Sequence, residues 1–483
     1  MLCPLYPVKG AYLATPGEWI GQRNGPIRVP IGIQCVEFVV RAKLKWLRPA
    51  LLLLLLGGLA TQAHANVAVL LEEPYSYDGA LAGTGHTAVY LTRVCAETPV
   101  MLRRCKPGEH GAVVSRYTRI GGYDWIAIPL VPYLYAVEQP EDIPLYADAK
   151  LVAFLRDQYR RTHLEDIAPD APGRETPKGD WLQLAGSAYD RASYGFEIET
   201  TPAQDDALIA WLNSRPNHAS YKVVSRNCAD FVRDILNFYY PKSVSHGSIP
   251  DFLISTPKHA ARSLVKYSQH HPDLEFTHFV VPQVPGAVKR SKPVRGVLES
   301  LVRAKKYVAA LIAFHPVVVG GVEATYFLTD RFNPAKNTLV FNLTGPLEAP
   351  PTKKERRAYQ KDLETVAARN QESEASSDGI SWRKFEEKAQ PTFDADGQAA
   401  LEASVGPDTE VVGVTRRDLL DGDAPANLER GLMVSRLRQA LARSRAPRIS
   451  DIELQKDWQL LEKIDRDDQE DQDANARLTE SSE

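Results

Sequence analysis

The chain has 483 residues, and its 44% hydrophobic and 25% charged content is ordinary for a globular protein of about two to four domains. Its formal net charge of -3 excludes a protein that binds nucleic acid along its whole length, because such binding needs a strongly basic face. We therefore expect no nucleic-acid partner.

A secretory leader is predicted at residues 41–65, where a basic stretch runs into an apolar one. The apolar part contains Leu51–Leu56, and the small-x-small sequence Ala63-His64-Ala65 that follows is typical of a cleavage site. The run is too short for a comfortable transmembrane helix, which needs about 20 residues. The leader predicts a periplasmic or secreted protein, either free or membrane-associated. The residue immediately after the cleavage site is Asn66 and not cysteine, so a lipoprotein is not expected.

About forty residues precede this leader, which is an unusual position for a signal peptide. We interpret them as the result of a misassigned start codon, with initiation near Val36, Val39 or Val40. N-terminal sequencing of a precursor that begins at Met1 would contradict this interpretation. In either case residues 1–65 are expected to be absent from the mature protein. The rest of the chain divides into a Cys/His domain at 66–245, an accessory region at 246–345 and a charged tail at 346–483.

Hydrophobic periodicity predicts a mixed fold for the Cys/His domain. Alternating or β-branched runs indicate strands at 68–71, 86–91, 112–117, 125–130 and 194–198. Helical spacing indicates helices at 147–163, at 201–213 and from Cys228 onward. We expect an α+β fold in which an antiparallel sheet packs on the helix that carries Cys228.

Three cysteines remain after the leader is removed. Cys95 and Cys105 flank a segment that reads as a strand, a loop and a returning strand, so in an oxidising compartment they are expected to form a disulfide. Cys228 is then unpaired. An unpaired thiol in an exported protein is a liability unless it is used, which favours a functional role for Cys228.

Cys228 is predicted to be the first residue of a helix. Asn227 is a natural N-cap, and Asp230 places an acid in the first turn, where the helix dipole favours it. The preceding Val223-Val224 suits the end of a strand. A helix N-terminus lowers the pKa of a thiol and so activates it as a nucleophile. The alternative is that Cys228 is a small core residue, because free cysteines are often buried.

A cysteine nucleophile needs a base within hydrogen-bond reach and a third group that orients the base. Of the eleven histidines, His86 is the best placed, because it starts a strand after the turn Gly83-Thr84-Gly85; the alternative is a structural strand histidine. The region after this strand offers Glu109, His110, Ser115, Tyr117 and Asp124 as third groups. We choose Asp124, because an acid can orient an imidazole, although a turn aspartate is the alternative.

The accessory region combines charge with an apolar segment. Residues 289–306 are basic, and residues 307–322 are apolar but interrupted by His315 and Pro316. This pattern fits a buried hairpin, or an element at 289–322 that rests on an anionic membrane surface. In the tail, residues 353–369 and 465–483 are expected to be solvated or disordered, with helices at 428–445 and 450–464.

Two stretches together resemble a known group of proteins. Gly85-His86-Thr87-Ala88-Val89-Tyr90-Leu91, followed much later by Asn227-Cys228-Ala229-Asp230-Phe231, is similar to the circularly permuted papain-like group. This group includes NlpC-type cell-wall peptidases, lecithin:retinol acyltransferase-like enzymes and the Lnb-type periplasmic N-acyltransferase domain, and the last is the most similar in arrangement. The resemblance covers about residues 66–240. It implies a permuted papain-like fold with Cys228 as nucleophile and His86 as base.

These observations predict an exported thiol enzyme that forms an acyl thioester on Cys228. Transfer of the acyl group to water makes a hydrolase, and transfer to an amine makes an acyltransferase, acting on a lipid or peptidoglycan-type substrate of the cell envelope. No metal motif such as Cys-x-x-Cys or His-Glu-x-x-His is present, and we expect neither a metal nor a cofactor. The alternative from another class is a non-catalytic envelope protein in which Cys228 and His86 are structural.

Overall fold

The described residues of the computed structural model all lie within His64–Glu483. They comprise residues 65–74, 84–170, 177, 179–284, 291–303, 316–329, 331–350, 382–405 and 408–415, with short pieces at 352–355, 357–358, 361, 364–365, 368, 428 and 431–432. The predicted leader at 41–65 and the predicted helices at 428–445 and 450–464 lie almost wholly outside these residues.

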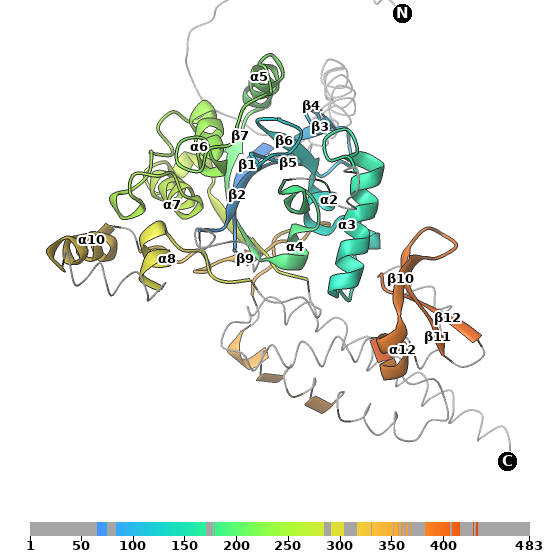
Figure 1. The fold of residues 1–483 in the computed structure, drawn as a ribbon. Coiled ribbons are helices and arrows are strands. Elements are labelled where there is room, and N and C mark those ends of the chain that lie inside the picture. The colour runs from blue at the N-terminus through green and yellow to red at the C-terminus, as the bar shows by residue number, and fades with distance from the viewer. Residues whose placement is uncertain are drawn as a thin grey trace, which may run out of the picture. The chain divides into compact units, whose positions relative to one another are not determined.

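A seven-stranded sheet organises the fold and combines strands of the predicted Cys/His domain with two strands, β8 and β9, from the accessory region (Figure 1). Its order is β6-β5-β2-β1-β7-β8-β9, and every neighbouring pair is antiparallel except β8–β9. The strands are β1 Ala65–Glu72, β2 His86–Leu91, β5 Ala112–Ser115, β6 Ile126–Pro129, β7 Ser193–Thr200, β8 Thr277–Val281 and β9 Leu339–Val340. The predicted α+β class with a largely antiparallel sheet is therefore confirmed.

The central strand β1 is buried on both faces. Because successive strand residues point to opposite faces, Val67, Val69 and Leu71 enter one hydrophobic core. Ala68 and Leu70 enter a second core on the other face. A strand covered on both sides needs apolar residues at every position, which explains the unbroken run in the sequence.

Helices cover both faces of the sheet (Figure 1). On one face lie α5 Pro202–Asn213, α6 Cys228–Tyr239 and α7 Pro257–Ser268. On the other lie α2 Leu130–Tyr135, α3 Ala149–His163 and α4 Ser187–Asp190. The residues at which these helices begin are set by local signals in the sequence. Thr201 caps α5 with a full capping box, for example, and proline occupies the first turn of α5 and α7.

A separate hairpin interrupts the sheet between β2 and β5. It consists of β3 Val94–Thr98 and β4 Met101–Arg104, which pair antiparallel. The predicted disulfide between Cys95 and Cys105 is present and closes this hairpin at its base.

The Cys/His domain also contains the 3-10 turns η2 Pro140–Asp142 and η3 Trp181–Gln183. The remaining elements belong to the accessory region and the tail. They are η4 Ile249–Asp251, η5 Pro272–Leu274, α8 Val297–Arg303, α10 Pro316–Thr329, α12 Trp382–Lys388 and the three-stranded sheet β10 Gln390–Phe393, β11 Ala399–Val405 and β12 Asp408–Gly413. The β10–β12 sheet was not predicted from the sequence of the tail. Within the described residues, no helix is both long enough and apolar enough to cross a membrane.

Candidate active site

Cys228 is the first residue of α6, as predicted. The Asn227 side chain accepts a hydrogen bond from the Asp230 backbone N–H (3.0 Å), and the Asp230 carboxylate accepts one from the Asn227 N–H (3.2 Å). This reciprocal capping box fixes the position at which the helix begins. Cys228 is 5% exposed and is the free cysteine of the described residues.

The segment before α6 differs from the prediction. Val223 and Val224 do not end a strand; they lie in a turn closed by two backbone hydrogen bonds between Lys222 and Arg226 (3.1 and 2.9 Å). Their side chains are exposed. β-branched residues favour strands only where they pack on a sheet, and this turn does not join the sheet, so the strand prediction was wrong here.

His86 starts β2 directly after Gly85, which has a φ of +69°. A Cβ atom at Gly85 would lie 2.1 Å from the Glu72 backbone oxygen, so this close approach of the chain requires glycine. The His86 ring stacks on Tyr117 with 5.2 Å between the ring centroids, and its Nε2 lies 3.1 Å from Ser115 Oγ.

The hydrogen bonds of Ser115 determine the tautomer of His86. Ser115 Oγ donates its single proton to the Thr87 carbonyl oxygen at 2.7 Å, because a carbonyl can only accept. The same Oγ must therefore accept from His86 Nε2. Nε2 carries the ring proton of the neutral imidazole, and Nδ1 holds the lone pair that can accept a proton.

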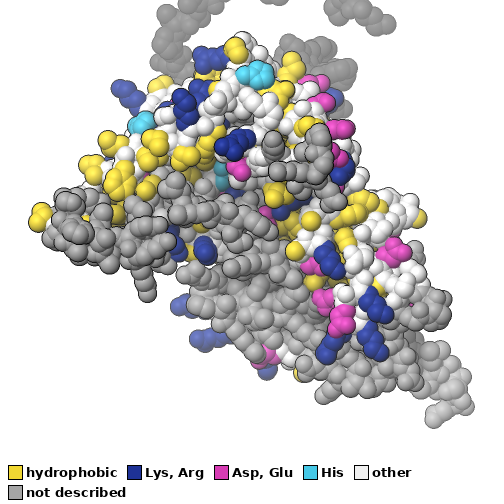
Figure 2. Space-filling model, viewed as in Figure 1, with side chains coloured by type: hydrophobic (Ala, Val, Ile, Leu, Met, Phe, Trp, Pro, Cys, Tyr) yellow, Lys and Arg dark blue, Asp and Glu magenta, His cyan; other side chains and the backbone are white. Residues whose placement is uncertain are grey.

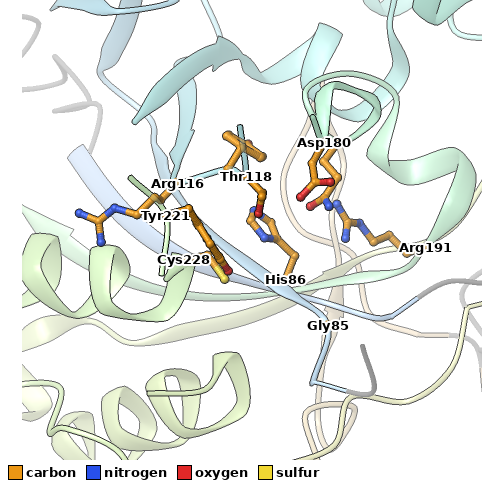
Figure 3. A pocket seen from close by; sticks show the side chains of 10 residues that line it. Gly85, His86, Arg116, Thr118, Asp180, Arg191, Tyr221 and Cys228 are labelled. Atoms are coloured by element: carbon orange, nitrogen blue, oxygen red, sulfur yellow. The ribbon is translucent and has the colours of Figure 1, made fainter. Parts of the chain in front are cut away.

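Cys228 and His86 line one cavity of about 90 Å³ (Figure 3). Its wall brings together residues from distant parts of the chain, namely Gly85, His86, Arg116, Tyr117, Thr118, Asp180, Gln183, Arg191, Tyr221 and Cys228. Most of these side chains are polar, so the cavity suits a polar reacting group such as an amide or ester. The structure thus brings the predicted nucleophile and the predicted base to one place.

Tyr221 and two backbone groups surround the sulfur atom of Cys228. Burial raises the pKa of the Cys228 thiol, and hydrogen bonds from the Thr87 backbone, the Tyr221 hydroxyl and the Ala229 backbone act against this rise. These three donors favour negative charge at this position. Tyr221 belongs to the stretch that resembles the Lnb-type domain, but it was not predicted as a site residue, because a tyrosine in a polar loop carries no local signal of a catalytic role.

The His86 pKa is shifted in the opposite direction. Burial, and then the positive charge of Arg191, lower the pKa of His86 well below its usual value near 6.5. With the pKa of the Cys228 thiol raised, both groups are neutral at neutral pH. The pair therefore rests as thiol and imidazole rather than as an ion pair.

Asp124 lies in a different environment from the one that we predicted. Arg116 donates two hydrogen bonds to its carboxylate (2.7 and 3.1 Å), and Arg226 donates two more (3.1 and 2.7 Å). Burial opposes ionisation, but these bonds outweigh it and lower the Asp124 pKa. Arg116 also donates to the Asn227 carbonyl oxygen (3.2 Å), so Asp124 is connected to the start of α6, while Ser115 is the residue bonded to His86.

A buried charged network lies next to His86. Glu72 is fully buried, pairs with His86 in the register of β1 and β2, and forms a 2.6 Å ion pair with Arg191. The Tyr133 hydroxyl donates a further hydrogen bond to the Glu72 carboxylate. Burial raises the pKa of Glu72, although Arg191 and Tyr133 oppose the rise. This network was not predicted. The one local signal for it in the sequence is the acid Glu72 at the end of an apolar strand.

One group of described residues has potential metal ligands in close proximity, and it consists of Cys95, Cys105 and Glu109. Both of its cysteines form the disulfide and cannot act as thiolate ligands. Comparison of the chain with protein-family models, with curated proteins and with solved structures found no match.

The neutral resting pair predicts an alkaline labelling profile for Cys228. We expect iodoacetamide to alkylate Cys228 with a midpoint above the usual thiol pKa, because the thiolate reacts and burial disfavours it. Tyr221→Phe removes a donor to the thiolate and should move the midpoint to still higher pH. Quantifying the adduct by mass spectrometry from pH 6 to pH 10 in roughly one-unit steps covers both sides of the reference value. A midpoint below neutral pH would instead indicate a resting ion pair.

Proposed function

We propose that this protein is an exported cysteine-dependent acyltransferase or hydrolase with a permuted papain-like arrangement. The observation that carries this proposal is the shared cavity of Cys228 and His86, in which an unpaired thiol at a helix start meets a strand histidine of fixed tautomer. The predicted leader at 41–65 supports export, and the substrate is a lipid or peptidoglycan-type component of the cell envelope.

Acylation begins from the neutral pair. His86 Nδ1 accepts the proton of Cys228 as the sulfur attacks the carbonyl carbon of an ester or amide, so that the imidazolium forms only as charge develops on the substrate. The resulting oxyanion is stabilised by N–H groups at the start of α6 and by the Tyr221 hydroxyl. His86 then returns the proton to the leaving alcohol or amine, and the acyl group remains on the sulfur as a thioester.

Deacylation uses the same base. His86 Nδ1 removes a proton from water or from an amine, which attacks the thioester and expels the Cys228 thiolate. The thiolate takes the proton back from the imidazolium, and the neutral pair is restored. Water gives a hydrolase and an amine gives an acyltransferase.

Ser115 and Asp124 do not react with the substrate themselves but act through neighbouring residues. Ser115 holds the His86 tautomer by accepting from Nε2, and Asp124 with Arg116 positions the Asn227 end of α6. Both are positioning residues. Asp124, the predicted third group, fits the second role through its bonds to Arg116.

The test is to trap the thioester. Incubation with p-nitrophenyl acetate should release nitrophenolate in a burst and leave an acetyl group on Cys228, found by peptide mass spectrometry at neutral pH. Cys228→Ala should lose both the burst and the adduct. Cys95→Ala/Cys105→Ala is the matched control, because it alters the other described cysteines and should keep both. An unmodified Cys228 in folded protein, with the burst unchanged in Cys228→Ala, would favour the alternative of a non-catalytic envelope protein.

A further inference from the structure

The exposed large hydrophobic side chains of the described residues are unevenly distributed. Eleven are exposed, and eight of them form what we call the apolar rim: Val223, Val224, Ile249, Phe252, Leu253, Val317, Phe327 and Leu328. The three outside the rim are Met101, Leu182 and Val411. Scattered single residues need no explanation, whereas a cluster of this kind marks an interaction surface.

The three segments of the apolar rim are connected. Asn227 Nδ2 donates to the carbonyl oxygens of Val223 (2.8 Å) and Ser255 (3.0 Å), so the cap of the cysteine helix joins the first segment to the second. Helix α10 contacts η4, which joins the third segment to the second. Figure 2 shows hydrophobic side chains gathered on the side of the molecule where α6 and α7 lie. The apolar rim therefore lies next to the start of α6.

The loop after η4 holds its apolar side chains outward. Phe252 and Leu253 have positive φ angles of 54° and 61°, a conformation that is unfavourable for such residues. The buried Asp251 carboxylate fixes the loop by accepting hydrogen bonds from Ser248 Oγ (3.1 Å), Thr256 Oγ1 (2.9 Å) and the Val297 N–H (2.7 Å). The fold thus maintains a strained backbone that exposes a phenylalanine and a leucine.

Cations outnumber exposed acids in two of the three segments of the apolar rim. Segments 220–226 and 241–256 contain Lys222, Arg226 and Lys242, while their one carboxylate, Asp251, is 2% exposed. Lys222 and Lys242 are exposed, whereas Arg226 pairs with Asp124. The third segment, α10, contains one acid and no lysine or arginine, and the sequence before it includes the basic run 289–306, with seven lysines and arginines and one acid. Apolar side chains beside cations are typical of surfaces that bind anionic lipid.

We propose that the apolar rim docks this protein on the surface of an anionic lipid bilayer, with the start of α6 facing the membrane. Phe252, Leu253 and Ile249 enter the interfacial layer, and the exposed Lys222 and Lys242 contact lipid headgroups. The docking rests on exposed side chains and not on the chemistry of Cys228. It would bring the cavity close to substrates held in or near the bilayer.

Vesicle sedimentation tests the proposal. The full chain is incubated with vesicles of phosphatidylcholine, with or without phosphatidylglycerol, at low and high salt. Phe252→Ser/Leu253→Ser should lower the partition coefficient onto anionic vesicles by about tenfold or more, because two large apolar side chains no longer leave water. Met101→Ser/Val411→Ser removes the same kind of exposed side chain elsewhere and should leave partitioning within about twofold of the wild type.

Other outcomes would overturn the docking proposal. One is wild-type protein that stays in the supernatant with anionic vesicles, and another is binding that both double variants retain equally. A dimer that Phe252→Ser/Leu253→Ser converts to a monomer, without vesicle binding, would assign the apolar rim to a second copy of the chain. Cys228→Ala should bind vesicles like the wild type, so a failure of the thiol chemistry and a failure of docking remain distinguishable.

Discussion

Replacing His86 with alanine is expected to slow acylation of Cys228 by about 10²–10⁴-fold, the usual contribution of a positioned general base. The effect should be large because the Cys228 thiol rests in its protonated form, so the reaction depends on a base during attack. The measurement is the single-turnover rate of nitrophenolate release from p-nitrophenyl acetate at neutral pH. A rate in His86→Ala equal to that of the wild type would remove His86 from the mechanism.

His278→Ala is the matched control for this experiment. His278 also lies in a strand of the sheet, stacks on an aromatic ring (Phe196, 4.5 Å between centroids) and has a pKa that burial lowers. It is not among the residues that line the cavity. Loss of this partly buried ring in His278→Ala should therefore affect the stability of the fold but not the acylation rate. Equal slowing in both variants would point to a general loss of structure.

Ser115 offers a finer test of the same base. Ser115→Ala frees the His86 Nε2 proton from its acceptor, so the imidazole is no longer confined to the tautomer with a lone pair on Nδ1. The acylation rate should fall, although less than in His86→Ala, and Ser115→Thr should restore it by returning the hydroxyl. A purely structural role for Ser115 would not predict this rescue.

Local patterns were sufficient to predict the parts of the site that depend on a single element. Cys228 at the start of α6 followed from a capping sequence and a helical apolar face, and both are read within a few residues. The Cys95–Cys105 disulfide could also be predicted locally, because the two cysteines flank one short hairpin. His86 was identified because a glycine turn precedes a clear strand.

Contacts that depend on strand pairing could not be predicted, so Ser115 was one of five candidate third groups and was not the one chosen. Ser115 meets His86 because β5 pairs with β2 in a register that sets Val114 opposite Val89, and the intervening hairpin of residues 94–104 hides this register in the sequence. Glu72 meets His86 for the same reason, across the pair β1–β2. Asp124 looked suitable because it is acidic, but its charge is matched by Arg116 and Arg226, which the sequence does not place nearby.

Burial is the main reason that the His86 pKa is low and the ring neutral, and the network next to His86 adds to this effect. Arg191 keeps a fixed positive charge near the imidazole, and Glu72 balances that charge inside the fold. Burying an ion pair costs desolvation energy, and well-packed apolar residues of similar volume often stabilise a fold at least as well. Its position next to the proposed base suggests that the pair adjusts the electrostatics of the site.

Replacing Glu72 with glutamine is expected to lower the free energy of unfolding by about 3–5 kcal/mol, because it leaves the Arg191 guanidinium buried without its counter-ion. Arg191 stays charged at every pH, but the folded pKa of Glu72 is raised, so the stability that Glu72 gives the wild type falls as the pH rises. The loss in Glu72→Gln should therefore be larger near pH 5 than near pH 8. Urea unfolding measures it. Asp206→Asn is the control, because it breaks the exposed ion pair with Arg104 and should cost no more than about 1 kcal/mol.

Arg191→Met should behave differently, because the partner that remains can titrate. Burial already raises the Glu72 pKa, and loss of Arg191 removes the main opposing charge, so the pKa should rise further. A carboxyl whose folded pKa lies above its unfolded value stabilises the fold below the unfolded pKa, and this contribution is lost as the pH rises through the folded value. Arg191→Met should therefore be less destabilised near pH 5 than near pH 8. Glu72→Gln/Arg191→Met removes both charges and should be more stable than the sum of the single losses predicts, and strict additivity would mean that the two groups do not interact.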